Sequence, residues 1–211
     1  MESRCENCII RQFNSLRALS KEELKKVSNA KISKKIKKGD ALFSEGQKLD
    51  GVYCVRNGVS KLSKLSSNGK EQIVKLTNRG EIMGQRSVIA EDYTNLSATA
   101  INDMEVCFIP KEIITTTLNT NPYFSLEVLR HMAHDLKEAD DVIVNMSQKT
   151  VKQRLAEALL YLRQNYGEDE SGFLLLTLSR DDYANIVGAT TESLIRMLSD
   201  FKKKGLIKTE G

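Results

Sequence analysis

The chain has 211 residues, 40% of them hydrophobic and 28% charged, so it is long enough for one large domain or two small ones with packed cores. It has no run of eighteen apolar residues, and its amino terminus has no apolar segment after a basic start. These features argue against a membrane-spanning or secreted protein and predict a cytoplasmic one. The net charge of +4 is weak evidence for a polyanionic partner.

The first 30 residues begin with a Cys-x-x-Cys pair, Cys5 and Cys8, and continue into a short helix. Ser20 is predicted as the N-cap of this helix, because Glu23, three residues later, completes a capping box. Structural disulfides are not expected in a reducing cytoplasm. The four cysteines of the chain are therefore candidates for free thiols, a metal site or a redox sensor.

Residues 31 to about 110 have the pattern of a small β domain. Short runs rich in Val, Ile and Leu are separated by turn signals such as Asn57-Gly58 and Asn68-Gly69, at a spacing of about ten residues. Several short strands at this spacing predict a small barrel or jelly roll, and both prolines are placed after the strands. The predicted strands are Gly51–Val55, Val59–Leu65, Gln72–Leu76, Ser97–Ile101 and Met104–Ile109.

Residues 123–147 form the clearest helix of the sequence. Its apolar residues alternate at spacings of three and four, which is the a/d pattern of a coiled-coil seam. The alternative is an ordinary amphipathic helix packed on its own domain, but such a helix has a broader apolar face. The pattern favours a two-stranded dimer seam made of Leu129, Met132, Leu136, Ala139, Ile143 and Met146.

The last part of the chain contains two short helices joined by a tight turn. Ser179 and Asp182 form an N-cap signal for the first helix, which Gly188 ends. Thr190 can cap a second helix over Thr191–Lys203. Two short helices joined in this way are the helix-turn-helix pattern. The buried side of the second helix is predicted to hold Leu194, Met197, Leu198 and Phe201.

The second helix of such a unit enters the major groove with its N-terminal residues at the base edges. Arg196 can donate two hydrogen bonds to guanine O6 and N7, and Glu192 can accept one from cytosine N4. Ile195 can touch a thymine methyl group, and Thr191 adjusts neighbouring contacts. Taken alone, Glu192 and Arg196 would be read as a surface salt bridge, but within the two-helix pattern base reading is favoured. Phosphates are predicted to be held by Lys202, Lys203 and Lys204.

The same residues resemble a known family. The stretch "LSRDDYANIVGATTESLIRML" (Leu178–Leu198), continued by "FKKKGLI", resembles the helix-turn-helix of the CRP/FNR family of bacterial transcription regulators. Upstream, "KKGDALFSEGQ", "GVYCVRNGVSKL" and "GEIMGQRSVI" resemble strands of that family's cyclic-nucleotide-binding-type β-roll, and "VCFIP" resembles the join to its dimerisation helix. The resemblance implies a homodimer that binds a twofold-symmetric DNA site and contacts RNA polymerase. It also implies a β-hairpin wing, trimmed or abbreviated near Gly211.

Cyclic-nucleotide receptors of this family resemble one another in a Gly-Glu and an Arg-Ser pair that hold ribose and phosphate. This sequence has Gln85 after Gly84, and Asn95-Leu96 where Arg-Ser would fall. An anionic phosphate would meet no cation there and would lose its charge-assisted hydrogen bonds. Cyclic AMP is therefore not the expected ligand, while the nearby Arg86 leaves an altered ligand open.

The cysteines resemble the ligands of FNR-type oxygen sensors, which hold an iron–sulfur cluster. Cys5 and Cys8 match the first two ligands and Cys107 matches the last, but the remaining ligand would fall at Asn14. Three thiolates do not complete a four-cysteine set. Cys54 could supply the missing thiolate, which gives the hypothesis of a [4Fe–4S] or similar centre bound by Cys5, Cys8, Cys54 and Cys107.

Strand alternation places Cys107 on the face opposite Val106 and Phe108, which suits a ligand outside the apolar interior, but it leaves the direction of Cys54 open. A thiol–disulfide switch or a zinc site also fits these cysteines, as does a set of thiols with no ligand. FNR-type sensors resemble one another in an acidic residue within the dimer helix, where this chain has Ala139. A small apolar residue there predicts a dimer that forms without a switch.

Together these patterns predict an α+β chain with a sensory jelly roll over residues 1–122, a dimerisation helix over 123–147 and a winged helix-turn-helix domain over 148–211. The predicted function is a homodimeric, sequence-specific DNA-binding transcription regulator that responds to a redox, oxygen or small-molecule signal. No nucleophile motif, phosphate loop or paired-carboxylate site supports an enzyme. The rival interpretation is a ligand-binding or redox module whose helix-turn-helix contacts protein rather than DNA.

Overall fold

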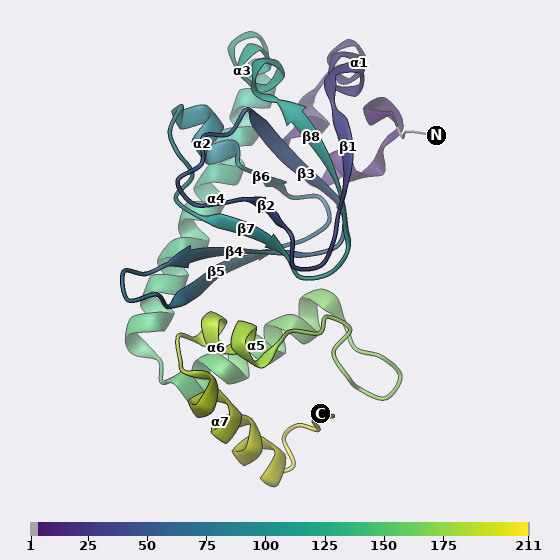
Figure 1. Ribbon diagram of the computed structural model, residues 1–211. Coiled ribbons are helices and arrows are strands. Elements are labelled where there is room, and N and C mark those ends of the chain that lie inside the picture. Colours follow the sequence, from purple (N-terminus) through teal and green to yellow (C-terminus); the bar gives the residue numbers. More distant parts are fainter. Residues whose placement is uncertain (1–3, 211) are drawn as a thin grey trace. The chain divides into compact units, whose positions relative to one another are not determined.

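The computed structural model describes residues 4–210, which form two compact units (Figure 1). The first unit contains the described residues up to Lys64 together with Val74–Glu138. The second contains Leu65–Ile73 together with the described residues from Ala139 onward. The long helix α4, Pro122–Gln148, contributes to both units. Within the described chain, no helix combines the length and the apolar character needed to cross a lipid bilayer.

Two four-stranded sheets form the jelly roll that the strand spacing predicts. Their strand orders are β1-β8-β3-β6 and β2-β7-β4-β5, and neighbouring strands pair antiparallel. Side chains from both sheets join one apolar core. The strands are β1 Ile32–Ile36, β2 Ala41–Phe43, β3 Gly51–Asn57, β4 Ser60–Leu65, β5 Glu71–Thr77, β6 Ile82–Met83, β7 Ser97–Ala100 and β8 Met104–Pro110.

Five predicted strands correspond to β3, β4, β5, β7 and β8 with ends shifted by one or two residues. The short strands β1, β2 and β6 were not predicted, nor were the helices α2, Gln85–Ala90, and α3, Lys111–Thr120. The placement of both prolines after the strands was wrong for Pro110, which closes β8. Pro122 takes the first position of α4, where a missing backbone N–H costs nothing.

An N-terminal segment covers one side of the first sheet. It consists of the short 3-10 turns η1 Cys5–Asn7, η2 Ile9–Phe13 and η3 Ser15–Ala18, followed by α1, Lys21–Ala30. The capping box predicted for Ser20 and Glu23 is confirmed, because each side chain accepts a hydrogen bond from the other residue's backbone N–H. This cap fixes the start of α1 and so orients the segment.

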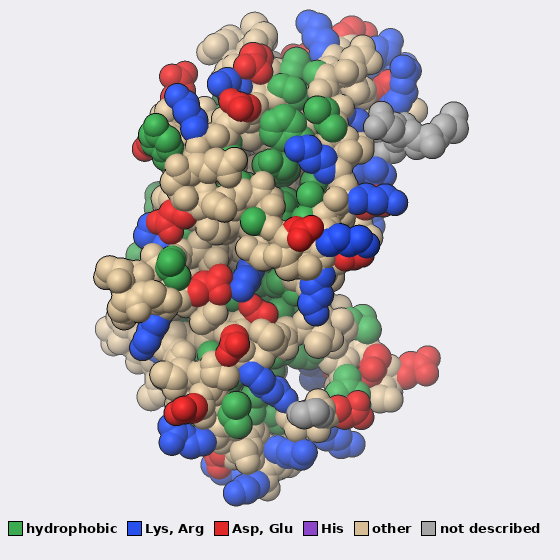
Figure 2. All heavy atoms as spheres, in the orientation of Figure 1, with side chains coloured by type: hydrophobic (Ala, Val, Ile, Leu, Met, Phe, Trp, Pro, Cys, Tyr) green, Lys and Arg blue, Asp and Glu red, His purple; other side chains and the backbone are tan. Residues whose placement is uncertain are grey.

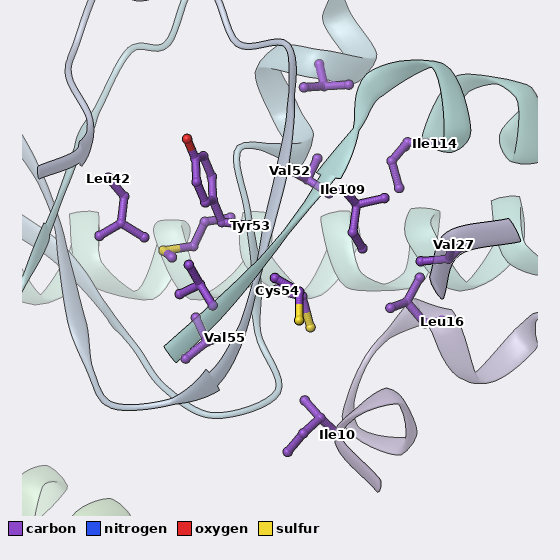
Figure 3. Packing of buried hydrophobic residues seen from close by; sticks show 14 of the residues in the cluster. Ile10, Leu16, Val27, Leu42, Val52, Tyr53, Cys54, Val55, Ile109 and Ile114 are labelled. Carbon is purple, nitrogen blue, oxygen red and sulfur yellow. The ribbon is translucent and has the colours of Figure 1, made fainter. Parts of the chain in front are cut away.

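The centre of the first unit is filled by valines of β3 and β8 and by Ile109 of β8 (Figure 3). Val52, Val55 and Val106 are completely buried, and Ile109 is nearly so. Full burial of such a side chain stabilises the fold by about 1.5–3 kcal/mol. The N-terminal segment adds Leu16, among others, to the same cluster, so the apolar core ties this segment to the sheet.

The second unit contains α5, Val151–Tyr166, α6, Arg180–Val187, and α7, Thr191–Lys203. The tip of the β4–β5 hairpin belongs to the same unit. An isolated bridge joins Glu168 and Leu174 in the loop before α6. No strand follows α7 among the residues that the structure describes, so the implied wing is not formed in them.

Candidate nucleic-acid interface and thiol site

The first helix of the pair, α6, begins where the sequence predicts. Ser179 Oγ accepts a hydrogen bond from Asp182 N at 3.0 Å, and Asp182 Oδ2 accepts one from Ser179 N at 3.3 Å. This capping box satisfies two backbone donors that would otherwise lack partners. Gly188 ends the helix with a φ of 64°, in a left-handed conformation that costs other residues about 1–2 kcal/mol. Both predicted ends of α6 are confirmed.

The second helix, α7, begins after Thr190, whose Oγ1 accepts a hydrogen bond from Ser193 N at 3.3 Å. Leu194 is completely buried, and Leu198 and Phe201 are nearly so. Their spacing places them on one face, by which α7 packs on α6. Met197, predicted with them, is half-buried. The opposite face of α7 is left to solvent.

We call Thr191, Glu192, Ile195 and Arg196 the reading face of α7. Glu192, Ile195 and Arg196 are exposed, and half of the Ile195 side chain is open to solvent. Thr191 is half-buried, and its Oγ1 donates to Asp181 Oδ1 at 2.5 Å. Within residues 4–210, Glu192 and Arg196 form no ion pair with each other. The salt bridge considered as the alternative is therefore absent from the described chain.

The basic residues Lys202, Lys203 and Lys204 are exposed at the end of α7, and Figure 2 shows Lys and Arg side chains gathered there. Lys204 Nζ lies 3.0 Å from Asp200 Oδ2. Hydrogen bonds from Lys152 of α5, and then from Lys204, lower the pKa of the Asp200 carboxyl group. A phosphate would have to compete with Asp200 for Lys204, whereas Lys203 has no such contact. The pairing with Lys152 spans 48 residues, so no local pattern signals it.

Two side chains from outside the helix pair hold the end of α6. Gln72 Nε2, near the start of β5, donates to Asn185 O at 2.6 Å and to Ile186 O at 3.2 Å. Arg154 Nε of α5 donates to Val187 O at 2.8 Å. The last carbonyl groups of a helix have no partners inside it, so these donors fix the position of α6. Sequence reasoning missed both residues, since neither belongs to the helix-turn-helix pattern.

The proposed seam residues of α4 separate into two kinds. Leu129, Leu136 and Ile143 are seven residues apart, and about 65% of each side chain is exposed. Ala139 is exposed as well, whereas Met132 and Met146 are half-buried. Large apolar side chains repeated every seven residues on a solvent-facing helix surface are typical of a seam that a second helix covers.

Cys54 of β3 and Cys107 of β8 are direct partners in the antiparallel pairing of these strands. Residues opposite each other across a ladder lie on the same face of the sheet. The pairing therefore gives Cys54 the direction that the sequence left open. Both side chains are about 5% exposed and belong to the apolar core. The expectation that Cys107 faces away from the apolar interior is therefore wrong, because the N-terminal segment packs on this face of the sheet. Figure 3 shows the sulfur of Cys54 directed toward the N-terminal segment that carries Ile10 and Leu16.

Asn14, which stands where the resemblance implies a cluster ligand, has a structural task of its own. It is 3% exposed, and its Nδ2 donates to Gly80 O at 2.8 Å. Its Oδ1 accepts a hydrogen bond from Leu16 N at 3.0 Å. The same Nδ2 lies 3.6 Å from Cys54 Sγ. Cys54 thus places a thiol beside the position that lacks one.

We call Cys5, Cys8, Cys54 and Cys107 the thiol site. Cys5 is buried and Cys8 is half-buried. Burial, and then the nearby Cys107, Cys8 and Cys5, raise the pKa of the Cys54 thiol to about 12. Burial also raises the pKa of Cys5. Lys31 Nζ lies 3.6 Å from Cys107 Sγ.

The spacing of the sulfurs bears on which metal fits. In residues 4–210, no three cysteine sulfurs lie within 4.8 Å of one another. A tetrahedral zinc ion with bonds of about 2.3 Å holds its thiolates about 4 Å apart. A cluster of several iron atoms holds its thiolates farther apart, because each is bound to a different iron. The described thiols are therefore not arranged at the spacing of a tetrahedral zinc site.

The place where the β-roll family binds its nucleotide is small in this chain. A cavity of about 70 Å³ there is lined by residues that include Gln85, Arg86, Asn95 and Leu96. Pockets for drug-sized ligands usually measure about 300–1,000 Å³. The small size agrees with the prediction against cyclic AMP, which stays a prediction, while Arg86 in the lining leaves an altered ligand open.

Comparisons with known proteins find two family models in this chain. A model described as the cyclic nucleotide-binding domain matches residues 33–121, and one described as the Crp-like helix-turn-helix domain matches residues 153–211. The chain is 30% identical to the anaerobic regulatory protein of Aggregatibacter actinomycetemcomitans, over 98% of this chain and 81% of that protein. It is 29% identical to the fumarate and nitrate reduction regulatory protein of Escherichia coli K12, over 98% and 84% of the two chains.

Solved structures share the fold. The c-di-GMP-responsive global regulator CLP of Xanthomonas campestris superposes with a TM-score of 0.80 at 16% identity, over 91% of this chain and 96% of that one. FixK2 of Bradyrhizobium japonicum superposes with a TM-score of 0.75 at 24% identity, over 86% and 89%. At these identities the likeness extends to the architecture alone.

Proposed function

The chain belongs to the CRP/FNR family of transcription regulators, and from this premise we propose that it binds a twofold-symmetric DNA site as a homodimer through α7. The observation that carries the proposal is the reading face. Glu192, Ile195 and Arg196 face solvent, while the opposite side of the helix is packed on α6. The first turn of α7 is thus held in place by packing on α6, while its polar side chains are accessible to a ligand.

Each residue of the reading face has a distinct role in base recognition. The Arg196 guanidinium donates two hydrogen bonds to guanine O6 and N7, and the Glu192 carboxylate accepts one from the paired cytosine N4. Ile195 contacts a thymine methyl group beside this pair. Thr191, tied to Asp181, fixes the first turn and adjusts the neighbouring contact. Phosphate contacts come from Lys202 and Lys203, and from Lys204 once it exchanges Asp200 for a phosphate.

The homodimer forms along α4. Leu129, Leu136 and Ile143 are the large exposed apolar residues of the α4 seam. Ala139 is the small exposed residue between them. No carboxylate occupies the Ala139 position, so the seam needs no signal to neutralise it. Two reading faces related by a twofold axis match half-sites about one helical turn apart. RNA polymerase is the partner that such a regulator contacts on the promoter.

Selection of duplexes from a random pool by the purified chain tests DNA reading. We expect an inverted repeat with a G·C pair in each half. Arg196→Ala should weaken specific binding by about 1–3 kcal/mol per half-site and relax the preference at that pair. The matched control is Lys203→Ala, which should weaken binding to all sequences about equally. If Arg196→Ala weakened binding to every sequence equally, Arg196 would contact only the DNA backbone and would not read a base.

The rival function, a module whose helix-turn-helix contacts protein, predicts a different outcome of the same selection. No sequence would be enriched, and Arg196→Ala would leave duplex binding as weak as that of the native chain. A positively charged surface alone gives only salt-dependent, sequence-independent binding. Enrichment that survives at raised salt therefore separates the two functions.

We further propose that the thiol site holds an iron–sulfur centre. In this centre Cys54 supplies the thiolate that the resemblance implies at position 14, where this chain has Asn14. Such a centre supplies an oxygen- or redox-sensitive group. The proposal is supported by the direct pairing of Cys54 with Cys107 and by the 3.6 Å between Asn14 Nδ2 and Cys54 Sγ. Asn14 and Lys31 place N–H donors on Cys54 and Cys107, which stabilises thiolate charge in a buried site.

Variants that move the thiol from position 54 to position 14 test this ligand set. Anaerobic reconstitution of the native chain should give bound iron and sulfide and visible absorption. Cys54→Ala should lose them, and the double variant Asn14→Cys with Cys54→Ala should regain them, because it moves the thiol to the neighbouring position. Full retention of iron and sulfide in Cys54→Ala would contradict the assignment. Binding of zinc without sulfide would replace the cluster by a zinc site.

A further inference from the structure

Cys54 and Cys107 stand opposite each other across the β3–β8 ladder, and this placement has a chemical consequence of its own. Directly opposed residues of an antiparallel pair have Cα atoms about 4.5–5.5 Å apart. Disulfide bonds join residues whose Cα atoms are about 4.4–6.8 Å apart. The two cysteines therefore satisfy the main distance condition for a bond without any movement of the strands.

The two side chains also meet the condition of direction. Opposed residues project from the same face of the sheet, so both sulfurs lie on the side covered by the N-terminal segment. Both cysteines are free in the structure. Cys5 and Cys8 lie on the N-terminal segment, and neither has a register that pairs it with a cysteine on a neighbouring strand.

We propose that Cys54 and Cys107 form a reversible cross-strand disulfide when the thiol site holds no metal, with hydrogen peroxide as the oxidant. The proposal deepens the sensory role of the same site and requires neither DNA reading nor a bound cluster. It separates the four cysteines into a strand pair that forms the bond and a terminal pair that does not.

The reaction proceeds in two balanced steps. The sulfur of one of the two cysteines, Cys54 or Cys107, attacks one peroxide oxygen. An S–O bond forms, the O–O bond breaks, and one water molecule leaves, which gives a sulfenic acid. The second sulfur then attacks the first, so that the S–S bond forms and the S–O bond breaks with loss of a second water. Two electrons pass from the sulfurs to the peroxide. The Lys31 ammonium group, 3.6 Å from Cys107 Sγ, stabilises negative charge that develops on sulfur during these steps.

The bond would exclude metal from the site. A sulfur that is bonded to another sulfur cannot serve as a thiolate ligand, so the oxidised pair leaves only Cys5 and Cys8. The oxidised chain is then unable to load a four-thiolate centre until a thiol reductant reopens the bond. The disulfide and the metal centre are alternative states of the same two sulfurs.

Peptide mapping of the metal-free full chain tests the proposal. The reduced chain is treated with a chelator, exposed to hydrogen peroxide, blocked with an alkylating agent and cut with trypsin. The sequence places Cys54 in the tryptic peptide 49–56, Cys107 in 87–111, and Cys5 with Cys8 together in 5–11. We expect peptides 49–56 and 87–111 to be linked, peptide 5–11 to be alkylated twice, and the link to disappear with dithiothreitol.

Variants separate this bond from other oxidations. Cys107→Ser should abolish the link, whereas Cys5→Ser, the matched control from the terminal pair, should leave it intact. An internal bond within peptide 5–11, or four alkylated cysteines after peroxide treatment, would overturn the proposal. Circular dichroism of each variant checks that the fold is kept. Since the readout is a covalent link, its failure leaves the DNA-reading proposal untouched.

Discussion

The helix pair α6–α7 and the thiol site are assembled in different ways. The helix pair is contiguous in sequence, and its boundaries are set by Ser179, Gly188 and Thr190 within the pair itself. The thiol site combines an N-terminal segment with two strands that are 53 residues apart at Cys54 and Cys107. A site built from local signals can be read from the sequence, while a site built by strand register requires the fold.

The comparison predicts that the buried face of α7 is where the helix pair is most sensitive. Leu194→Ala should destabilise the second unit by about 2–5 kcal/mol, because it removes a completely buried side chain and leaves a cavity. Ile195→Ala, one residue along on the exposed face, should change stability by less than about 0.5 kcal/mol. Urea denaturation followed by circular dichroism measures both. Equal losses for the two variants would contradict the assignment of faces.

Replacement of Asn14 tests whether contacts between residues far apart in the sequence hold the thiol site together. Asn14→Ala should cost about 1–3 kcal/mol, because the buried carbonyl group of Gly80 and the N–H of Leu16 lose their partner. The loss should be concentrated in the N-terminal segment and appear as faster hydrogen exchange there. Asn7→Ala, an exposed asparagine of the same segment, is the control. Unchanged exchange in Asn14→Ala would show that the apolar contacts alone hold the segment.

A local cap should have a smaller effect. Ser179→Ala should destabilise α6 by about 1 kcal/mol, since it removes the acceptor for the Asp182 backbone N–H. Ser199→Ala, an exposed serine within α7, lacks a capping role and serves as the comparison. The two midpoints of urea denaturation should differ accordingly. Indistinguishable midpoints would mean that packing on α7 and the donors from Gln72 and Arg154 suffice to hold α6.

The last prediction is a pH dependence from Glu81. Burial raises the pKa of this carboxyl group to about 7 against the attraction of Lys75, and Asp135 and Glu138 raise it further. The folded chain therefore holds a proton that the unfolded chain releases near pH 4.5. Stability from this group should fall as pH rises from about 4.5 to about 7 and stay level above that range. Glu81→Gln should flatten the profile of denaturation midpoints, and an unchanged slope would contradict the assignment.

The sequence was sufficient for elements that carry their own signals. The capping boxes at Ser20 and Ser179 and the break at Gly188 follow from side chains within three residues of each helix end, and all three are confirmed. The strands β1 and β2 were missed because they are short or rich in lysine, so their burial depends on the strands beside them.

The functional sites also differ in whether nearby or distant residues in the sequence determine them. Alternation within one strand placed Cys107 on the face opposite Val106, but it could not show that the N-terminal segment buries this face. It left the direction of Cys54 open, because that direction depends on the register with β8. The task of Asn14 depends on Gly80, and the anchoring of α6 depends on Gln72, 113 residues before Asn185. Contacts over such separations leave no pattern in a single sequence.

The most direct test of the account is the sedimentation of the full chain with a duplex that carries its selected inverted repeat. We predict two chains per duplex, and also a dimer of the free chain at micromolar concentration, with Leu136→Glu reducing both to a single chain. A native chain that sediments as a monomer and binds the duplex one to one would contradict the claim that two copies present α7 together.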